Sequence, residues 1–424
     1  MTAGEHAVRP LGRLDSEALR RRLKTALSRE SARPAPAVHE SSQRPAPRKA
    51  APPAPDVGGQ VVENELGRFV MQEHQFPDSR MHGRFPIQRL RALSPEWVRD
   101  ISQGEIGPAA SKRWAFLDTE TTGLAGGTGT CAFLVGVGSV ESQGFRVRLF
   151  FMRDFDEEAA MLKALAEHLS RYQVLLTYNG KTFDAPLLET RFRMQRQRNP
   201  LAEMGHIDLL HPARRLWRER MSNCRLATLE SEILGFRRRG DIPGFLIPQR
   251  YFEFLRTRRG AGLRPVFFHN VRDIVSLACL GSVVMSSYSD PGRAPLRHGQ
   301  DLMGLAQWLT STRRDEVALR LYRSAIRAGL PNSCLARCLL EAARIERRLG
   351  NPRAQVELLR DLLRIPEVDH SLRVEALEAL AKHFEHVERN YAKALHHTRT
   401  AQRHAPGEDL WHRENRLLQK IASK

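Results

Sequence analysis

The apolar residues between positions 112 and 285 change their spacing several times, and this alternation most narrows the folds open to the chain. Three apolar runs joined by short turns predict consecutive strands, after which helical spacing alternates with a further strand. The expected strands are Trp114–Leu117, Cys131–Val140, Phe145–Phe151 and Val174–Tyr178, and the expected helices are Asp156–Ser170, Ala185–Met194, a stretch from Leu226 to Leu234 and one beginning near His269. This order predicts an α/β fold in which helices flank a mixed sheet.

A stretch rich in proline, glycine and arginine, Asp290–Gly299, ends this pattern, and only helical spacing follows it. The expected helices are Asp301–Thr312, Asp315–Ala328, Cys334–Leu349, Arg353–Leu363, Ser371–Phe384 and Tyr391–Arg403. Ala318, Ala354 and Ala392 take similar places in three of them, at a spacing close to tetratricopeptide periods, although most consensus residues are absent. We expect an all-α domain of helical-hairpin repeats over residues 298–424, with a plain helical bundle as the alternative.

The chain before the α/β region divides into two parts. Residues 1–60 are basic and rich in proline and alanine, so they predict a largely disordered arm; Leu19, Leu23 and Leu27 line a short helix that is either weakly ordered or a docking element. Residues 61–105 are mixed in pattern and interrupted by prolines. They predict an extension that packs on the α/β domain, which we expect to span residues 106–290.

The charge balance indicates the class of partner. The 424 residues include 67 Lys and Arg against 48 Asp and Glu, a formal net charge of +19. Such an excess predicts a polyanionic partner, with nucleic acid favoured over an anionic lipid surface. Five scattered cysteines without a CxxC pair argue against zinc, and the absence of a long apolar run or secretion signal predicts a cytoplasmic protein without a membrane span.

Two acids follow an apolar run that predicts a buried strand. Asp118 and Glu120 are two residues apart, so on a strand both side chains point to one face. Burying paired carboxylates without a countercharge costs several kcal/mol or raises one pKa. Because hard oxygen ligands suit Mg²⁺ or Mn²⁺, a divalent cation removes this difficulty.

Further acids stand at the ends of other elements. Asp184 follows an apolar strand through a polar turn, and Asp273 lies four residues after His269 on an expected helix. That spacing places the imidazole and the carboxylate on one helix face, where the imidazole could serve as a general base. Taken singly, each acid could instead cap a turn or a helix.

The segments DTETTGL, NGKTFD and HNVRD together resemble the three exonuclease motifs of the DEDD (DnaQ-like) 3'-5' exonucleases of the ribonuclease H-like superfamily. The run from about 112 to 285 is most similar to the YprB-like group. The resemblance implies a two-metal-ion nuclease acting on DNA or RNA, with single-stranded ends as substrate. It implies Asp118, Glu120, Asp184 and Asp273 as ligands of two Mg²⁺ or Mn²⁺ ions, and Thr119 and Asn179 as substrate contacts.

One residue departs from the family pattern. The histidine branch has four residues between the base and the last aspartate, whereas His269 has the three of the tyrosine branch. His269 is therefore a candidate for the base, for orienting water, or for packing the helix start. A non-catalytic nucleic-acid-binding scaffold that acts through its helical repeats, with a protein partner there, is the alternative function.

For two further segments the sequence supports less specific predictions. One segment contains residue types that often bind metals: His206, Asp208 and His211. Their position in the chain favours a structural role beside the site over metal binding. Many arginines and no lysine occur between Arg191 and Arg259, including the run Arg237–Arg239, and arginine suits bidentate contact with phosphate. The segment Asp241–Phe252 is expected to shape the cleft.

Overall fold

The computed structural model describes residues 58–123 and 129–423. The arm predicted for residues 1–60, with its short helix, lies outside the described residues apart from positions 58–60. The loop residues 124–128 between the first two expected strands lie outside them as well.

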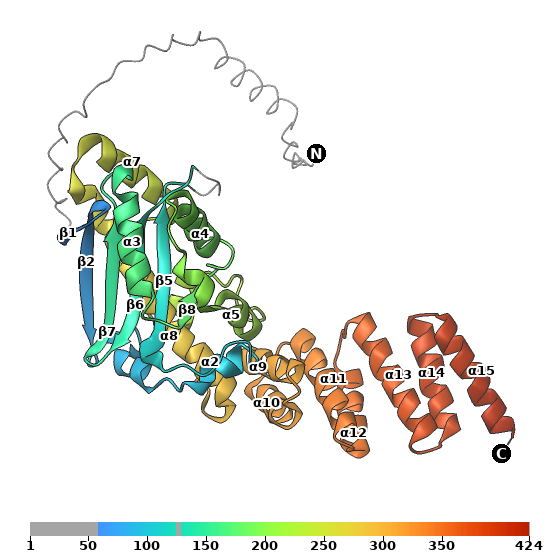
Figure 1. Cartoon of the computed structure of the whole chain (residues 1–424). Coiled ribbons are helices and arrows are strands. Elements are labelled where there is room, and N and C mark those ends of the chain that lie inside the picture. The colour runs from blue at the N-terminus through green and yellow to red at the C-terminus, as the bar shows by residue number, and fades with distance from the viewer. Residues whose placement is uncertain (1–57, 124–128, 424) are drawn as a thin grey trace, which may run out of the picture. The chain divides into compact units, whose positions relative to one another are not determined.

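A seven-stranded mixed sheet forms the centre of the α/β region, which confirms the expected fold class (Figure 1). Across the sheet the strands are β1 (Gln60–Asn64), β2 (Gly67–Pro77), β7 (Gly144–Phe151), β6 (Ala132–Glu141), β5 (Trp114–Thr121), β8 (Val174–Thr177) and β9 (Gly205–Asp208). The pairs from β1 to β5 are antiparallel, whereas β8 runs parallel to β5 and β9 parallel to β8. Two short strands, β3 (Met81–His82) and β4 (Phe85–Pro86), pair separately.

The segment before the expected domain contributes to the sheet itself. β2 pairs with β7 over most of its length, from Val70 opposite Phe151 to Pro77 opposite Gly144. Its pattern is hard to recognise because polar residues such as Gln72 and His74 occupy much of the strand. β9 was likewise not expected, since only four residues form it.

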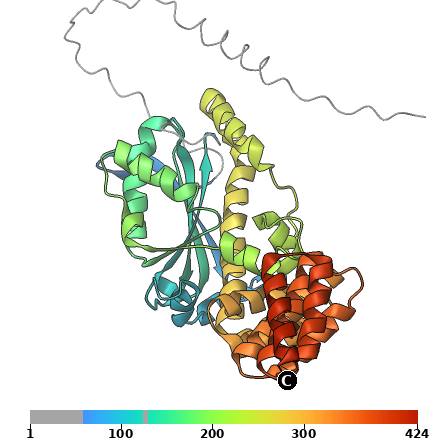
Figure 2. The ribbon, with the colours of Figure 1, turned by 90° about the vertical axis from the view of Figure 1, so that its right-hand side faces the viewer.

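Helices cover both faces of the sheet (Figure 2). α3 (Glu158–Leu169) packs on β2 and β7, while α8 (Arg264–Ser289) packs on β5, β6 and β7 on the opposite side. The remaining helices of this region are α2 (Glu96–Ile101), α4 (Asp184–Met194), α5 (Leu210–Trp217), α6 (Leu226–Leu229), a π-helical turn at Glu230–Leu234, and α7 (Ile247–Thr257). Short 3-10 helices occur at Ile87–Ala92, Ser111–Arg113, Phe155–Glu157, Pro200–Glu203, Gly244–Leu246, Gly260–Leu263 and Pro291–Arg293.

The expectation that a helix begins near His269 is wrong by five residues, because α8 begins at Arg264. Pro265 lies in its first turn, where a missing N–H costs nothing, so this proline starts the helix. With its leading 3-10 turn, α8 is the one described helix long and apolar enough to cross a membrane, but 83% of its apolar window is buried inside the molecule. It is the core helix of the α/β region.

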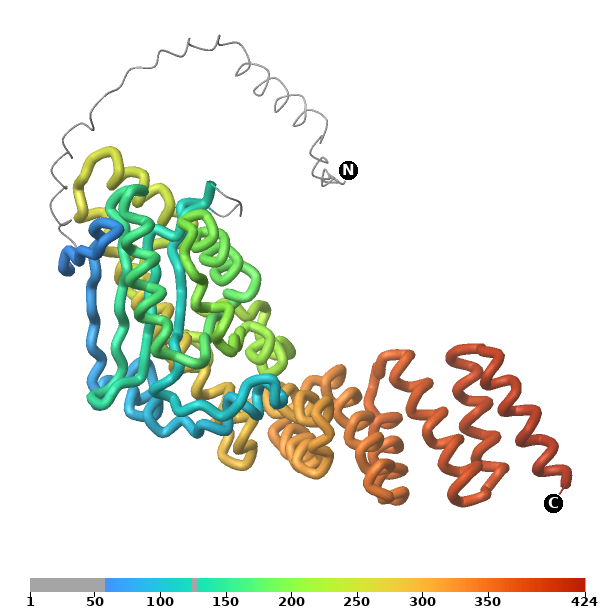
Figure 3. The backbone as a smooth tube through the Cα atoms, viewed as in Figure 1, coloured from blue at the N-terminus to red at the C-terminus, as the bar shows by residue number. Residues whose placement is uncertain are grey.

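The C-terminal region is all helical, as expected. Consecutive helices lie beside one another in chain order (Figure 3). They are α9 (Gly299–Ser311), α10 (Asp315–Ala328), α11 (Asn332–Arg348), α12 (Pro352–Arg364), α13 (His370–His386), α14 (Tyr391–His404) and α15 (Glu408–Ala422). The last helix was not expected; only Leu410 and Leu417 are buried along it, two turns apart.

The first of these helices packs on α5 of the α/β region. A Cβ added at Gly304 of α9 would lie 2.5 Å from the carbonyl oxygen of Arg215, so the two helices approach closely only because a glycine is present. Beside this contact, Asp301 accepts two hydrogen bonds from Arg220, at 2.8 and 2.9 Å.

Candidate active site

Four acids from three separate elements come close enough to one another for their charges to interact. Asp118 and Glu120 lie on β5, Asp184 is the first residue of α4, and Asp273 lies on α8. β5 and β8 are parallel, so the end of β5 and the turn that leads from β8 into α4 meet at one edge of the sheet. α8 packs directly on β5 and supplies the fourth acid.

The electrostatics of these acids show how close together they lie. Burial raises the pKa of Asp118 well above its usual range, and the charges of Asp273, Glu120 and Asp184 raise it further. Burial, Asp273 and Asp184 likewise raise the pKa of Glu120, against a hydrogen bond from Asn270. Burial also raises the pKa of Asp184 to about 6. The four carboxylates therefore form one mutually repelling group.

Polar neighbours partly compensate the charge of these carboxylates through hydrogen bonds. Asn270 Nδ2 donates to Asp118 Oδ2 at 2.9 Å, and Thr119 Oγ1 donates to Asp184 Oδ1 at 2.5 Å. Arg238 donates to Asp273. The contacts of Asn270 and Arg238 with these acids were not predicted from the sequence, because nothing in their own segments marks them as partners of these acids.

Within residues 58–123 and 129–423 no three His, Cys, Asp or Glu side chains are grouped closely enough to hold a metal ion. The protein's own donors instead turn toward the carboxylate oxygens, as the contacts of Arg238, Asn270 and Thr119 show. The four carboxylates still fit a hard divalent cation by their chemistry, because oxygen ligands suit such ions and a positive ion reduces the repulsion between the carboxylates.

His269 lies in the second turn of α8, so the interpretation that it packs the helix start is wrong. Its Nδ1 lies 3.0 Å from Asp241 Oδ1, and its Nε2 lies 3.7 Å from Asp273 Oδ2. Burial opposes ionisation of Asp241, but Arg238 and His269 outweigh it and lower the pKa of this carboxyl. Asp241 belongs to the segment expected to shape the cleft, and its contact with His269 gives that segment a definite role.

Arg238 joins several acids of the site. It donates through Nε and Nη2 to Glu230, both at 2.6 Å, and through Nη1 to Asp241 at 2.8 Å. Glu230 is buried at the start of the π-helical turn, and such turns are frequent at functional sites. The sequence left the run Arg237–Arg239 open between phosphate contact and a solvated face, and neither describes Arg238, whose N–H groups donate to carboxylates.

Asp208 supports the turn of the second motif. Its Oδ1 accepts from the backbone N–H of Asn179 at 2.8 Å and of Leu210 at 3.0 Å, and its Oδ2 accepts from that of Lys181 at 3.0 Å. These bonds hold Asn179 at a φ of 67°, a left-handed conformation that asparagine tolerates better than most residues. Nearby, His206 Nε2 lies 2.9 Å from the hydroxyl of Thr177.

Comparison with known proteins agrees with this architecture. Residues 115–285 match the model of the RNase H superfamily, and residues 302–398 match a tetratricopeptide repeat model. Over 338 residues the chain is 31% identical to the uncharacterized protein YprB of Bacillus subtilis (strain 168), a match that covers 79% of this chain and 80% of YprB. The chain belongs to the YprB family.

Membership of the YprB family confirms the resemblance seen in the sequence, and the repeat match favours hairpin repeats over a plain bundle. The RNase H-like domain suggests a nuclease that binds nucleic acid, and nucleases of this superfamily typically use divalent metals. The tetratricopeptide repeats suggest interaction with protein.

Proposed function

We propose that this YprB-family protein is a 3'-5' exonuclease that hydrolyses phosphodiester bonds of DNA or RNA with two divalent ions. The observation that carries the proposal is the convergence of four carboxylates from β5, α4 and α8, two of them buried and two partly buried. Such a group lowers the stability of the folded protein on its own, because each ionised acid raises the cost of ionising the others. Cation binding is the function that accounts for it best.

Asp118, Glu120, Asp184 and Asp273 are the residues that would hold Mg²⁺ or Mn²⁺. When bound, such ions act as Lewis acids and stabilise the charge that develops during hydrolysis of a phosphodiester. The contacts of Asn270 with Asp118 and of Thr119 with Asp184 orient two of these carboxylates. In this proposal Arg238 balances the charge of Asp273 in the protein without ions.

In this proposal His269 moves the proton. If its Nδ1–H is donated to the carboxylate of Asp241, Nε2 carries the lone pair and faces the side of Asp273. A neutral imidazole held in that tautomer can accept a proton from the attacking water. Asn179, at the turn before Asp184, is the proposed contact to the end of the substrate strand.

The test is Mn²⁺-dependent degradation of end-labelled oligonucleotides by Asp118→Asn and Asp184→Asn variants. We expect each change to lower the rate by at least about 10³-fold, roughly 4 kcal/mol of transition-state stabilisation, while the circular dichroism spectrum stays unchanged. Asp361→Asn, on the exposed face of α12, is the matched control and should retain full activity. Full activity in both site variants would refute the assignment.

The position of the label and the form of the substrate test the finer assignment. A 5'-labelled strand should shorten stepwise from its 3' end in a chelator-sensitive manner. A circular single strand should survive, whereas its cleavage would show an endonuclease on the same fold. Binding without any shortening of strands would favour the scaffold alternative.

A further inference from the structure

A groove of about 700 Å³ opens beside the turn of the second motif. It is lined by Tyr178 and Asn179 of that turn, by α5, and by the loop from residue 218 to residue 226. Apart from Asn179, its lining has no part in the proposed catalytic machinery. Because Asn179 lies five residues before Asp184, the groove begins where the chain turns toward the four acids.

The charge of the groove is positive. Arg214, Arg218 and Arg225 line it, and no Asp or Glu is among its described lining residues. All three arginines are exposed. Within the described part of the chain, Arg214 and Arg225 form no ion pair. Arg218 has one acidic neighbour, Glu219 at 3.5 Å, which Arg337 also binds at 2.6 Å.

The walls of the groove are fixed by hydrogen bonds. The Tyr178 hydroxyl donates to the carbonyl oxygen of Cys224, which ties the loop to the turn. Asn223 Oδ1 accepts from the N–H of Arg225 at 3.0 Å and from the Thr228 hydroxyl at 2.8 Å. A binding surface with ordered walls loses less conformational entropy when a ligand arrives.

We propose that this groove binds the phosphodiester backbone of a single strand of DNA or RNA and leads its end toward the four acids. This inference rests on the proposed nuclease function and names the path of its substrate. The planar guanidinium of arginine matches the oxygens of a phosphate, and pockets of roughly 300–1,000 Å³ hold ligands of one or two nucleotides in size, not a duplex. Asn179, whose backbone N–H is bound by Asp208, marks the end of the path at the acids.

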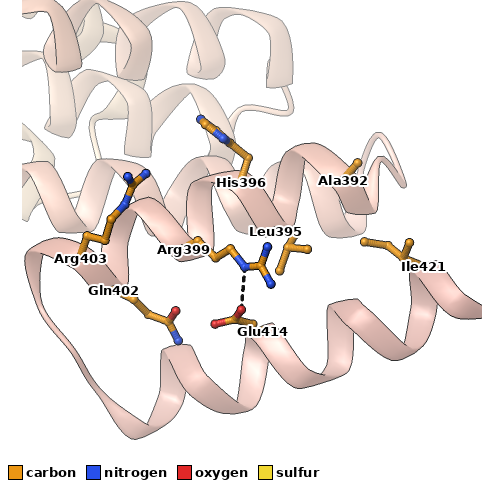
Figure 4. A pocket seen from close by; sticks show the side chains of 8 residues that line it. All are labelled: Ala392, Leu395, His396, Arg399, Gln402, Arg403, Glu414 and Ile421. Atoms are coloured by element: carbon orange, nitrogen blue, oxygen red, sulfur yellow. Dashed lines mark hydrogen bonds and ion pairs between the residues drawn. The ribbon is translucent and has the colours of Figure 1, made fainter.

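A second groove of similar size, about 710 Å³, lies between α14 and α15 and suits a polyanion less well (Figure 4). There Arg399 points at Glu414 and pairs with it at 2.7 Å, so an acid stands in the lining. None of the residues that line it belongs to the elements that carry the four acids.

The test is binding of fluorescent single-stranded DNA and RNA of the same sequence by the full chain in EDTA, so that no bound metal is required. The groove variant is Arg214→Ala/Arg218→Ala/Arg225→Ala. The matched control, Arg320→Ala/Arg347→Ala/Arg360→Ala, removes the same charge from exposed positions of the helical repeats. We expect the groove variant to raise Kd by at least about tenfold and to lower the salt slope of binding by about 2, with little change in the control.

A triple Lys variant of the groove residues keeps the charge, so it should restore the salt slope but only part of the affinity, because lysine lacks the planar fork that matches a phosphate. Equal effects of the groove and control variants on both DNA and RNA would overturn the proposal, as would equal binding of a duplex. The two hypotheses fail separately. Binding that depends on the groove without Mn²⁺-dependent degradation refutes the nuclease, whereas degradation by the groove variant with unchanged KM refutes the groove.

Discussion

At the scale of single residues, the buried acids make the site costly in the absence of metal. Asp184 is buried at the start of α4, and burial raises its pKa to about 6, above the value near 3.9 of an unfolded chain. A raised carboxyl pKa contributes stability that is complete below the unfolded value and is lost as the pH rises through the folded value. Stability in a chelator should therefore fall between about pH 4 and pH 6.

This loss can be measured by urea unfolding in EDTA at pH 5 and pH 8. Relative to Asp184→Asn, the wild type should lose stability across this interval by an amount on the order of 1 kcal/mol. Mn²⁺ should raise the Tm of the wild type more at pH 8 than at pH 5, because more carboxylates are ionised at the higher pH. A difference between the two proteins that does not change with pH would contradict the burial argument.

Asp241 contacts the Nδ1 atom of His269 and is a candidate for orienting its ring. Replacing it by Asn keeps the size of the side chain but removes the carboxylate that lies 3.0 Å from Nδ1. We expect kcat to fall by about 10²-fold with little change in KM, as for loss of general-base catalysis. His269→Gln should have an effect of similar size, and the double variant should be no worse than either one. An unaffected kcat would remove Asp241 from the mechanism.

At the scale of elements, the site depends on how closely α8 lies on the sheet. Gly136 and Gly138 of β6 face this helix, and a Cβ at Gly136 would lie 2.0 Å from Asn270 Oδ1 and 2.2 Å from Ile274. The same helix carries Asn270 and Asp273, so its distance from the sheet sets the distance between Asp273 and the acids of β5.

Gly136→Ala should push α8 away from β6. We expect a loss of roughly 1–3 kcal/mol of stability, typical of overpacking, together with a marked fall in nuclease activity. Gly262→Ala is the matched control, since a Cβ there has no atom within 4 Å and the backbone needs no glycine. Chemical unfolding and rate measurements on the same preparations check both effects, and an unchanged activity would show that the spacing of α8 is not critical.

At the scale of the whole molecule, the helical repeats are joined to the α/β region through α5. α9 packs on α5 at Gly304, Asp301 is paired with Arg220, and Glu219 is paired with Arg337 of α11. Because α5 also lines the positively charged groove, the repeats support one wall of that groove.

Removing Arg220 tests this connection. Arg220→Ala leaves Asp301, whose side chain is only 3% exposed, as a buried and unpaired charge. We expect a loss of about 3 kcal/mol in the free energy of unfolding, as is typical when one partner of a buried pair is deleted. The neighbouring Arg218→Ala, at a side chain 65% exposed, should cost little stability. Equal stability of the two variants would show that the pair adds nothing to the junction.

Much of the fold could be predicted from local patterns. The bounds of β6, β7, β8 and α4 agree with the expected segments to within one residue at each end, because the spacing of apolar residues reflects the period of each element. The segments that were missed lack a clear apolar period: β2 has a mostly polar pattern, and α15 buries only two leucines. Their conformation depends on what they pack against.

The sequence by itself determined most of the order of strands and helices and the place of Asp184 at the start of a helix, since both depend on residues that are neighbours along the chain. Only the tertiary structure decided which side chains form hydrogen bonds with the residues of the site. Arg238 reaches Asp273 across 35 positions, Asp241 reaches His269 across 28, and Asn270 reaches Asp118 across 152. The physical reason is that a hydrogen bond depends on distance in space, and the packing of α8 and the 230–241 segment on the sheet sets that distance.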